Sequence, residues 1–246
     1  MDNKKIEKWN KKAKNYARYQ EGEERFEAKV IQDTQKLGIN FKNKTVIDIG
    51  CGSGVYTLRV AKLAKTVVAL DFSSEMIKVL LEDAKKLDLT NLIPVVSSWD
   101  DYRVDEKFDI AFCTMSPAVK NEYQLEKMHN SAKSKVFLGW FGQREARILD
   151  AIFKAHNVSY TPPNGAQKTQ EWLEKNNISY KEKIFNETKT KSREFEEAVT
   201  NFSWHLEVRG IMPQKEKIEE ILQDFRDDMG IVQERYINQM KLLVWE

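Results

Sequence analysis

TVIDIGCGSG, residues 45–54, joins a short β-branched run to three alternating glycines. The apolar run Thr45–Ile49 predicts a buried parallel strand, and helix-compatible spacing resumes from Val55 to Leu63. Strand, glycine loop and helix in this order are typical of a nucleotide-binding turn. Glycine accepts positive φ and lets a ligand approach the backbone. The following helix start offers unpaired N–H groups to a polar or anionic group.

A dinucleotide is one candidate ligand for this loop, and a turn without any ligand is the structural alternative. The dinucleotide pattern Gly-x-Gly-x-x-Gly would place its third glycine at position 55. That position is Val55, and the third glycine is Gly54. Asp48, just before the first glycine, is also foreign to the dinucleotide pattern. Both departures disfavour a nicotinamide dehydrogenase.

A second hydrophobic run, Thr66–Asp71, ends in an acid. A carboxylate at the end of the neighbouring strand can accept hydrogen bonds from both hydroxyls of a ribose. Ser73 can cap the helix that follows, with Glu75 in its first turn. The second strand therefore strengthens the prediction of a nucleoside ligand.

Asp48-x-Gly50-x-Gly52-x-Gly54 resembles the first motif of class I S-adenosylmethionine-dependent methyltransferases, and Leu70–Met76 resembles their second-strand motif. The resemblance covers residues 45–141 well and the remainder only in pattern. It implies S-adenosylmethionine as cofactor, with the loop around its methionine part and Asp71 on the ribose. It also implies an α/β, Rossmann-like methyltransferase fold: a seven-stranded, mostly parallel sheet of order 3-2-1-4-5-7-6 with helices on both faces.

The family usually carries an acid for the adenine amino group in the turn after strand three. Here Ser98 stands at that position and Trp99 follows, so Asp100 could supply the acid, or the serine could act in its place. Trp99 could flank the adenine, or it could simply cover the sheet end. The resemblance implies a set of cofactor-binding residues that comprises Asp48, Ile49, Gly50, Cys51, Gly52, Gly54, Asp71, Phe72, Ser98, Trp99, Thr114 and Tyr19.

The rest of the chain is read as parts of one methyltransferase domain, residues 1–246. Residues 1–40 are predicted to form an N-terminal helical lid, 41–141 the cofactor-binding half, and 142–246 the substrate-side half. Strand three contains Pro94, which an edge strand tolerates. Later elements are predicted as helices at Arg144–His156 and 167–176, a strand at Ser179–Asn186, a helix pair from Ser192, which would cap it, to Asp228, and a last strand at Met240–Trp245.

Composition narrows the class of protein. A net charge of +2 with scattered lysines gives no electrostatic argument for nucleic acid. No apolar run reaches the roughly 18 residues that a membrane span needs, and the charged N-terminus lacks a signal-peptide core. The two cysteines, Cys51 and Cys113, are expected to stay reduced in a cytoplasmic enzyme. No metal is predicted, because the histidines lack metal-site spacing.

The sequence favours a methyltransferase of a small-molecule acceptor. An RNA or protein methyltransferase and a non-catalytic S-adenosylmethionine-binding protein remain the alternatives. The turn Met115–Ala118 is not of the Asn-Pro-Pro-Tyr type that resembles enzymes acting on bases or glutamine. The histidines His129, His156 and His205 are unranked candidates for a general base. No catalytic residue and no oligomeric state are predicted.

Overall fold

The structure, a computed structural model, describes residues 3–142 and 145–246. The chain divides into two compact units. The first comprises Met1–Phe141, Asn164–Ile184 and Met240–Glu246, and the second comprises Gly142–Pro163 and Phe185–Gln239. The strands β7 (Tyr180–Glu194) and β8 (Ile231–Trp245) contribute residues to both units.

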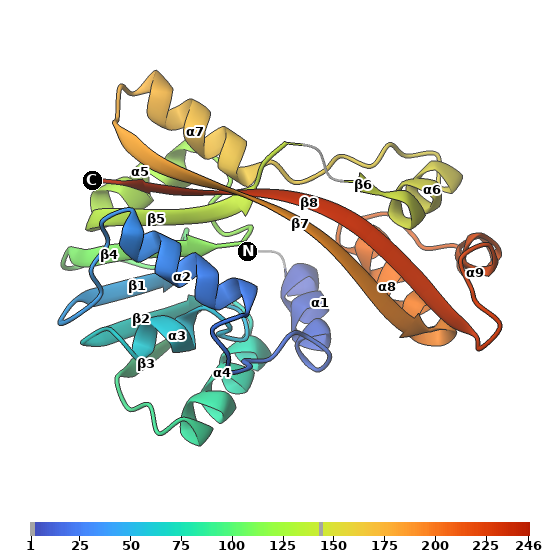
Figure 1. Ribbon diagram of the computed structural model, residues 1–246, viewed down its shortest axis with the longest axis horizontal. Coiled ribbons are helices and arrows are strands. Elements are labelled where there is room, and N and C mark those ends of the chain that lie inside the picture. The colour runs from blue at the N-terminus through green and yellow to red at the C-terminus, as the bar shows by residue number, and fades with distance from the viewer. Residues whose placement is uncertain (1–2, 143–144) are drawn as a thin grey trace. The chain divides into compact units, whose positions relative to one another are not determined.

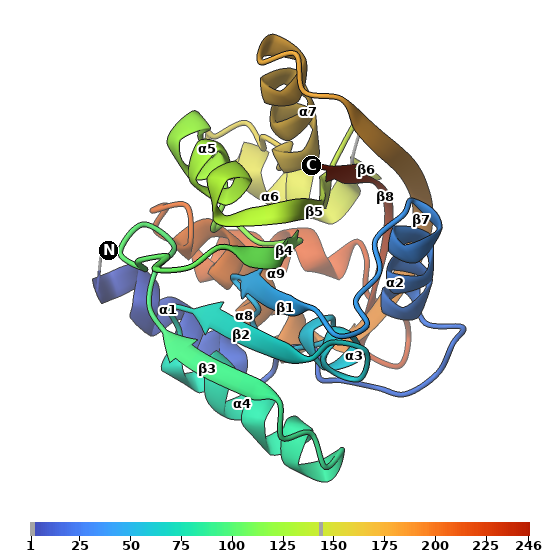
Figure 2. The same ribbon diagram turned by 90° about the vertical axis from the view of Figure 1, so that its left-hand side faces the viewer.

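A twisted, mostly parallel sheet forms the centre of the first unit. Its order is β3-β2-β1-β4-β5-β8, with β7 paired to β8 (Figures 1 and 2). The first five strands are parallel, and β8 runs antiparallel to β5. Their bounds are β1 Thr45–Ile49, β2 Thr66–Asp71, β3 Leu92–Val96, β4 Phe108–Thr114 and β5 Ala132–Trp140. Because the carboxyl ends of parallel strands share one edge, β1, β2, β3 and β4 all deliver their following loops there.

Helices cover both faces of this sheet because successive strand residues point to opposite faces. On one face, Ile47, Ile49, Leu70 and Cys113 pack with residues of α5 (Glu122–Ser131) and α7 (Gly165–Lys175). On the other, Ala69 packs with residues of α3 (Thr57–Ala61) and α4 (Ser74–Lys86). The N-terminal helices are α1 (Asn3–Ala13), which contacts α4, and α2 (Phe26–Lys36), which contacts α3.

The second unit has its own apolar core. It contains β6 (Glu145–Ala146), α6 (Arg147–Ala155), α8 (Phe195–Glu207) and α9 (Lys215–Gln223). Buried residues of the three helices pack with Val232 and Tyr236 of β8. The helix pair predicted between the sixth and seventh strands of the family fold is therefore present as α8 and α9.

The predicted fold class is confirmed, and β1 and β2 have the predicted bounds. Pro94 lies on β3, at the edge of the sheet, as the proline suggested. The sheet has eight strands rather than seven, because the two-residue β6 pairs with β8 at Ala146 and Tyr236. Without β6, the order of the other strands is the predicted one.

Several predicted boundaries were wrong. The strands β7 and β8 are each 15 residues long, which is longer than predicted. Their additional polar residues suggested a loop and a helix cap in the sequence, but they belong to the strands. Ser192 lies within β7 and donates to Gln233 Oε1 at 2.9 Å, and α8 begins at Phe195 without a side-chain cap. The helix after the glycine loop covers only Thr57–Ala61. The predicted start at Arg144 lies outside the described residues, and α6 begins at Arg147.

Candidate functional site

The glycine loop after β1 is bonded to the end of β2. The N–H groups of Gly50 and Cys51 both donate to the carbonyl oxygen of Leu70, at 2.7 and 3.0 Å. Ile49, the last residue of β1, is fully buried directly before the loop. These bonds place the loop at the carboxyl edge of the sheet, beside the residue that follows Leu70.

The three glycines all have positive φ, but their surroundings differ. A Cβ on Gly50 would lie 1.9 Å from Ser116 Oγ, and a Cβ on Gly54 would lie 2.7 Å from Cγ of Leu80. A Cβ on Gly52 would meet no atom within 4 Å. Gly50 and Gly54 are thus required by packing, whereas Gly52 borders open space that a ligand could fill.

Asp71 joins the loop to the next strand and helix. Its Oδ2 accepts from the N–H of Gly52 at 2.9 Å, and its Oδ1 accepts from the N–H of Ser73 at 2.8 Å. Burial raises the pKa of Asp71, although these backbone bonds oppose the rise. Each carboxylate oxygen can accept a second hydrogen bond, so the side chain can still take the two hydroxyls of a ribose.

Asp48 is a buried acid on the opposite strand face from Ile47 and Ile49. Its Oδ2 accepts from the hydroxyl of Thr57 at 2.6 Å, while Oδ1 has no hydrogen-bond partner among the described residues. Burial raises the pKa of Asp48 to about 7, against the Thr57 bond and with help from the nearby charge of Asp71. A buried oxygen without a partner is costly, so it indicates a site for a donor that arrives with a ligand.

The open face of Gly52, the orphan oxygen of Asp48 and the carboxylate of Asp71 fit the cofactor that the sequence motifs imply. S-Adenosylmethionine carries an ammonium group and a ribose, both hydrogen-bond donors, and a small residue is needed where its chain passes the loop. Asp48 lies on β1, Gly52 lies in the loop that follows β1, and Asp71 ends β2. The two strands are parallel neighbours paired in register, Asp48 with Ala69 and Ile49 with Leu70.

The turn after β3 places Ser98 and Trp99 differently. The hydroxyl of Ser98 donates to Asp101 Oδ2 at 2.5 Å and accepts from the N–H of Asp101 at 3.2 Å. Trp99 is buried in the core, and its indole N–H donates to the carbonyl of Gln124 at 3.2 Å. Asp100 accepts from the side-chain amide of Gln124 at 2.7 Å. Core packing thus accounts for the position of Trp99, and the Ser98 hydroxyl is hydrogen-bonded to the carboxylate of Asp101.

The end of β4 meets the glycine loop from the other side. Thr114 is buried, and Met115 follows with a positive φ of 51° and donates to the carbonyl of Leu138 at 2.7 Å. Ser116 then reaches the Gly50 backbone, and its hydroxyl accepts from the N–H of Ala118 at 3.2 Å. Ser116 was not among the predicted site residues, because nothing in its local sequence shows which glycine it faces.

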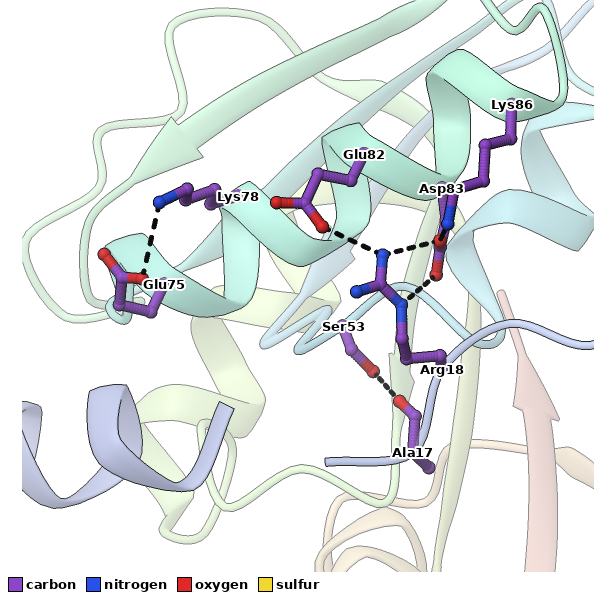
Figure 3. Close-up of polar contacts among 8 residues, drawn as sticks. All are labelled: Ala17, Arg18, Ser53, Glu75, Lys78, Glu82, Asp83 and Lys86. Carbon is purple, nitrogen blue, oxygen red and sulfur yellow. Dashed lines mark hydrogen bonds and ion pairs between the residues drawn. The ribbon is translucent and has the colours of Figure 1, made fainter. Parts of the chain in front are cut away.

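The N-terminal segment is tied to the same region through polar contacts that the sequence did not reveal. The Ser53 hydroxyl donates to the carbonyl of Ala17 at 2.5 Å, and the Arg18 guanidinium donates to Asp83 at 2.6 and 3.0 Å and to Glu82 at 3.0 Å. Figure 3 shows these contacts. Burial alone would raise the pKa of Asp83, but hydrogen bonds from Arg18 and Lys86 outweigh it and hold the pKa low. We call these contacts, made by Ala17 and Arg18, the N-terminal latch.

Two further predicted residues, Tyr19 and Phe72, belong to the N-terminal segment or contact it. The Tyr19 hydroxyl donates to Glu21 at 2.8 Å, and its ring lies 5.1 Å from the cationic groups of Arg59 and Lys62. Phe72 contacts Trp9 edge to face, with ring centroids 6.4 Å apart. Both positions therefore join the N-terminal segment to the cofactor half of the chain.

The remaining candidates for chemistry lie elsewhere. Both cysteines are free thiols, and burial raises the pKa of each, which disfavours a reactive thiolate. His129 accepts from the Trp245 indole at 3.1 Å, and His156, in the second unit, accepts from the N–H of Gln214 at 3.0 Å. Among residues 3–142 and 145–246, no cluster of three or more His, Cys, Asp or Glu could hold a metal. No helix of that part of the chain is long and apolar enough to cross a membrane.

Comparison with known proteins identifies the family. Residues 40–225 match the family described as "Methyltransferase domain". The chain therefore belongs to this family and is a class I S-adenosylmethionine-dependent methyltransferase domain, with S-adenosylmethionine as its cofactor.

The individual relatives that match cover about half of this chain. An uncharacterized protein of Haemophilus influenzae is 32% identical over 115 residues, 46% of this chain and 42% of the relative. Putative methyltransferase 235L of Invertebrate iridescent virus 6 is 31% identical over 134 residues, 53% of this chain and 45% of the relative. This chain thus spans less than half the length of both. The crystal structure of the YcgJ protein from Bacillus subtilis has a similar fold, with a TM-score of 0.57 and 13% identity over 88% of this chain and 97% of that one.

Alanine at two of the glycines should separate packing from ligand access. We expect Gly50→Ala to lower the free energy of unfolding by about 3 kcal/mol or more, since its Cβ would overlap Ser116 at positive φ. Gly52→Ala should cost only about 1 kcal/mol yet weaken S-adenosylhomocysteine binding at least about tenfold, because its Cβ would enter the open space. Urea unfolding and calorimetric titration measure the two effects. Equal affinity of wild type and Gly52→Ala would contradict the assignment of this space.

Asp48 should make stability depend on pH. Its pKa is about 7 in the folded chain against an ordinary 3.8, so the folded state binds the extra proton between these values. Stability attributable to Asp48 therefore falls as the pH rises from about 4 to about 7. Relative to Asp48→Asn, wild type should lose about 2 to 4 kcal/mol across this window. Urea unfolding at several pH values checks this, and parallel profiles for the two proteins would refute it. Thr57→Val should move the transition to higher pH.

Proposed function

We propose that this chain binds S-adenosylmethionine at the edge formed by the loops after β1, β2, β3 and β4, and transfers its methyl group to a small-molecule acceptor. The observation that carries the proposal is the open face of Gly52, whose N–H donates to the carboxylate of Asp71. The orphan oxygen of Asp48 on the same strand–loop unit supports it. In this proposal residues 1–246 act as one methyltransferase domain, with 1–40 as lid, 41–141 as cofactor half and 142–246 as acceptor side.

The proposed contacts follow the order of the strands. The backbone of Ile49, Gly50, Cys51, Gly52 and Gly54 surrounds the methionine part, and Asp48 accepts from its ammonium group. Asp71 binds the ribose, beside Phe72. Ser98 faces the adenine amino group, with Trp99 packed behind the turn. Thr114 stands where cofactor and acceptor meet, and Tyr19 belongs to the segment that closes over them.

The cofactor supplies an electrophilic methyl group on a sulfonium that leaves uncharged. The protein therefore has no new anion to stabilise on the leaving group, and its contribution is alignment and exclusion of water. Asp71 and the glycine loop fix the cofactor, and the N-terminal latch restricts access of water. A general base is needed only where the acceptor must lose a proton, and no described residue is assigned that role.

Two observations support a small molecule as the acceptor. The net charge of +2 offers no field for nucleic acid. The latch ties residues 17 and 18 to the cofactor half, which suits an acceptor that can be enclosed. Matched relatives are named both for a small molecule, as ubiquinone biosynthesis O-methyltransferase, and for a protein, as ribosomal protein L11 methyltransferase. Measuring turnover with supplied small-molecule and protein acceptors distinguishes the two kinds of methyltransferase from each other. It also distinguishes both from a cofactor-binding protein without activity.

Titration with S-adenosylhomocysteine and, separately, with NAD tests the cofactor. We expect wild type to bind S-adenosylhomocysteine and not NAD, and Asp71→Ala to bind it at least about tenfold more weakly, because two charge-assisted hydrogen bonds are lost. Glu106→Ala, which removes one exposed acid, is the control and should bind as wild type does. Binding of NAD, or no binding by wild type, would overturn the proposal.

Arg18 tests the lid. Arg18→Gln breaks the ion pair with buried Asp83 while keeping a polar side chain. We expect bound S-adenosylhomocysteine to dissociate about three to ten times faster, because the segment over the site opens more often. Stopped-flow displacement measures this rate, and Lys14→Gln, at an exposed position of the same segment, is the matched control. An unchanged rate would show that the latch does not close the site.

A further inference from the structure

The turn after β3 is anchored at its first residue to the ribose acid. The N–H of Ser97 donates to the carbonyl of Asp71 at 3.0 Å, and the N–H of Tyr102 donates back to the carbonyl of Ser98 at 3.0 Å. Within this turn the Ser98 hydroxyl donates its hydrogen bond to the carboxylate of Asp101. The Ser98 oxygen also accepts from the N–H of Asp101 at 3.2 Å. Its second lone pair remains as an acceptor, the role that an exocyclic amino group requires.

A lysine from another element holds the backbone of this turn. The ammonium group of Lys127, on α5, donates to the carbonyl oxygens of Trp99, Asp100 and Tyr102, at 2.5, 3.2 and 2.6 Å. An ammonium has three N–H donors, and here all three are used on one turn. The same group lies 4.5 Å from the centre of the Trp99 ring, within range of a cation–π contact.

Gln124, three residues earlier on α5, makes the other attachments. Its side-chain amide donates to Asp100 Oδ1 at 2.7 Å, and its backbone carbonyl accepts from the Trp99 indole at 3.2 Å. The side-chain oxygen accepts from the N–H of Lys120 at 3.0 Å. Gln124 is buried, so each of its polar atoms has a use within the protein.

We propose that Lys127, supported by Gln124, is a positioning residue that holds the turn 97–102 in the shape that recognises the adenine base. The inference rests on the proposed function, because it assumes that Ser98 faces the base. Three carbonyl oxygens of the turn 97–102 accept from Lys127, and the negative charges of Asp100 and Asp101 lie near it. Without it, three carbonyls would lose a charged donor and the Ser98–Asp101 pair would lose its fixed place.

The electrostatics agree with a partly buried, structural lysine. Burial lowers the pKa of Lys127, and the nearby charges of Asp100 and Asp101 oppose this. The two acidic neighbours thus offset part of the desolvation that disfavours the charged form of Lys127. Such a group is replaced poorly by any neutral side chain.

The test compares Lys127→Met with Lys120→Met, which removes a lysine at an exposed position just before the same helix. Calorimetry measures the affinity for S-adenosylhomocysteine and for S-inosylhomocysteine, which lacks the exocyclic amino group. For Lys127→Met we expect about tenfold weaker binding of the adenine ligand. We also expect the ratio of the affinities for the adenine and the hypoxanthine ligand to fall toward one. The Lys120→Met protein should keep both the wild-type affinity for S-adenosylhomocysteine and the wild-type preference for adenine.

The outcomes separate this inference from the proposed function. If wild type does not bind S-adenosylhomocysteine, the proposed function fails and the inference with it. If wild type binds and Lys127→Met retains the same base preference, only the inference is overturned, even where the variant melts at a lower temperature. If Lys127→Met does not fold, Lys127→Gln and Lys127→Arg replace it. Amide exchange at Tyr102, measured by NMR, should accelerate in Lys127→Gln and recover in Lys127→Arg, and equal rates would contradict the role.

Discussion

The carboxylate of Asp71 is the contact on which the site depends. It accepts from the N–H of Gly52 in the loop after β1 and from the N–H of Ser73 before α4. The carbonyl of the same residue accepts from Ser97, in the turn after β3. One residue at the end of β2 thus fixes three loops from three neighbouring strands. A ligand that spans these loops meets a surface whose parts are already joined.

Steric crowding supplies the second constraint. Gly50 lies so close to Ser116 that no side chain fits at position 50. The absence of a side chain allows the loop after β1 to pack directly against the turn after β4. Gly54 is held in the same way against Leu80 of α4. Gly52, between them, is the glycine that faces open space. The alternating glycines therefore serve two purposes, close packing at the outer positions and access at the central one.

The fold could be predicted because its signals are local. Apolar runs rich in β-branched residues set the bounds of β1 and β2, and the glycine spacing with Asp48 and Asp71 identified the family. The site was predicted less completely, since many of its contacts join residues far apart in sequence. Arg18 and Asp83, or Lys127 and Trp99, carry no pattern that pairs them. Trp99 was read as a possible ligand contact, but its burial depends on α5, which its own neighbourhood does not describe. The length of β7 was missed because its polar residues have the composition of a loop.

Three carbonyl oxygens that converge on one positive charge form the kind of arrangement that binds alkali cations in other proteins. In this turn the cation is the end of the Lys127 side chain, covalently attached to α5. A free ion would have to be captured from solution, and its occupancy would vary with the ionic composition of the surroundings. A tethered ammonium is present at a fixed stoichiometry, so the turn carries its own counter-ion and needs none from the medium.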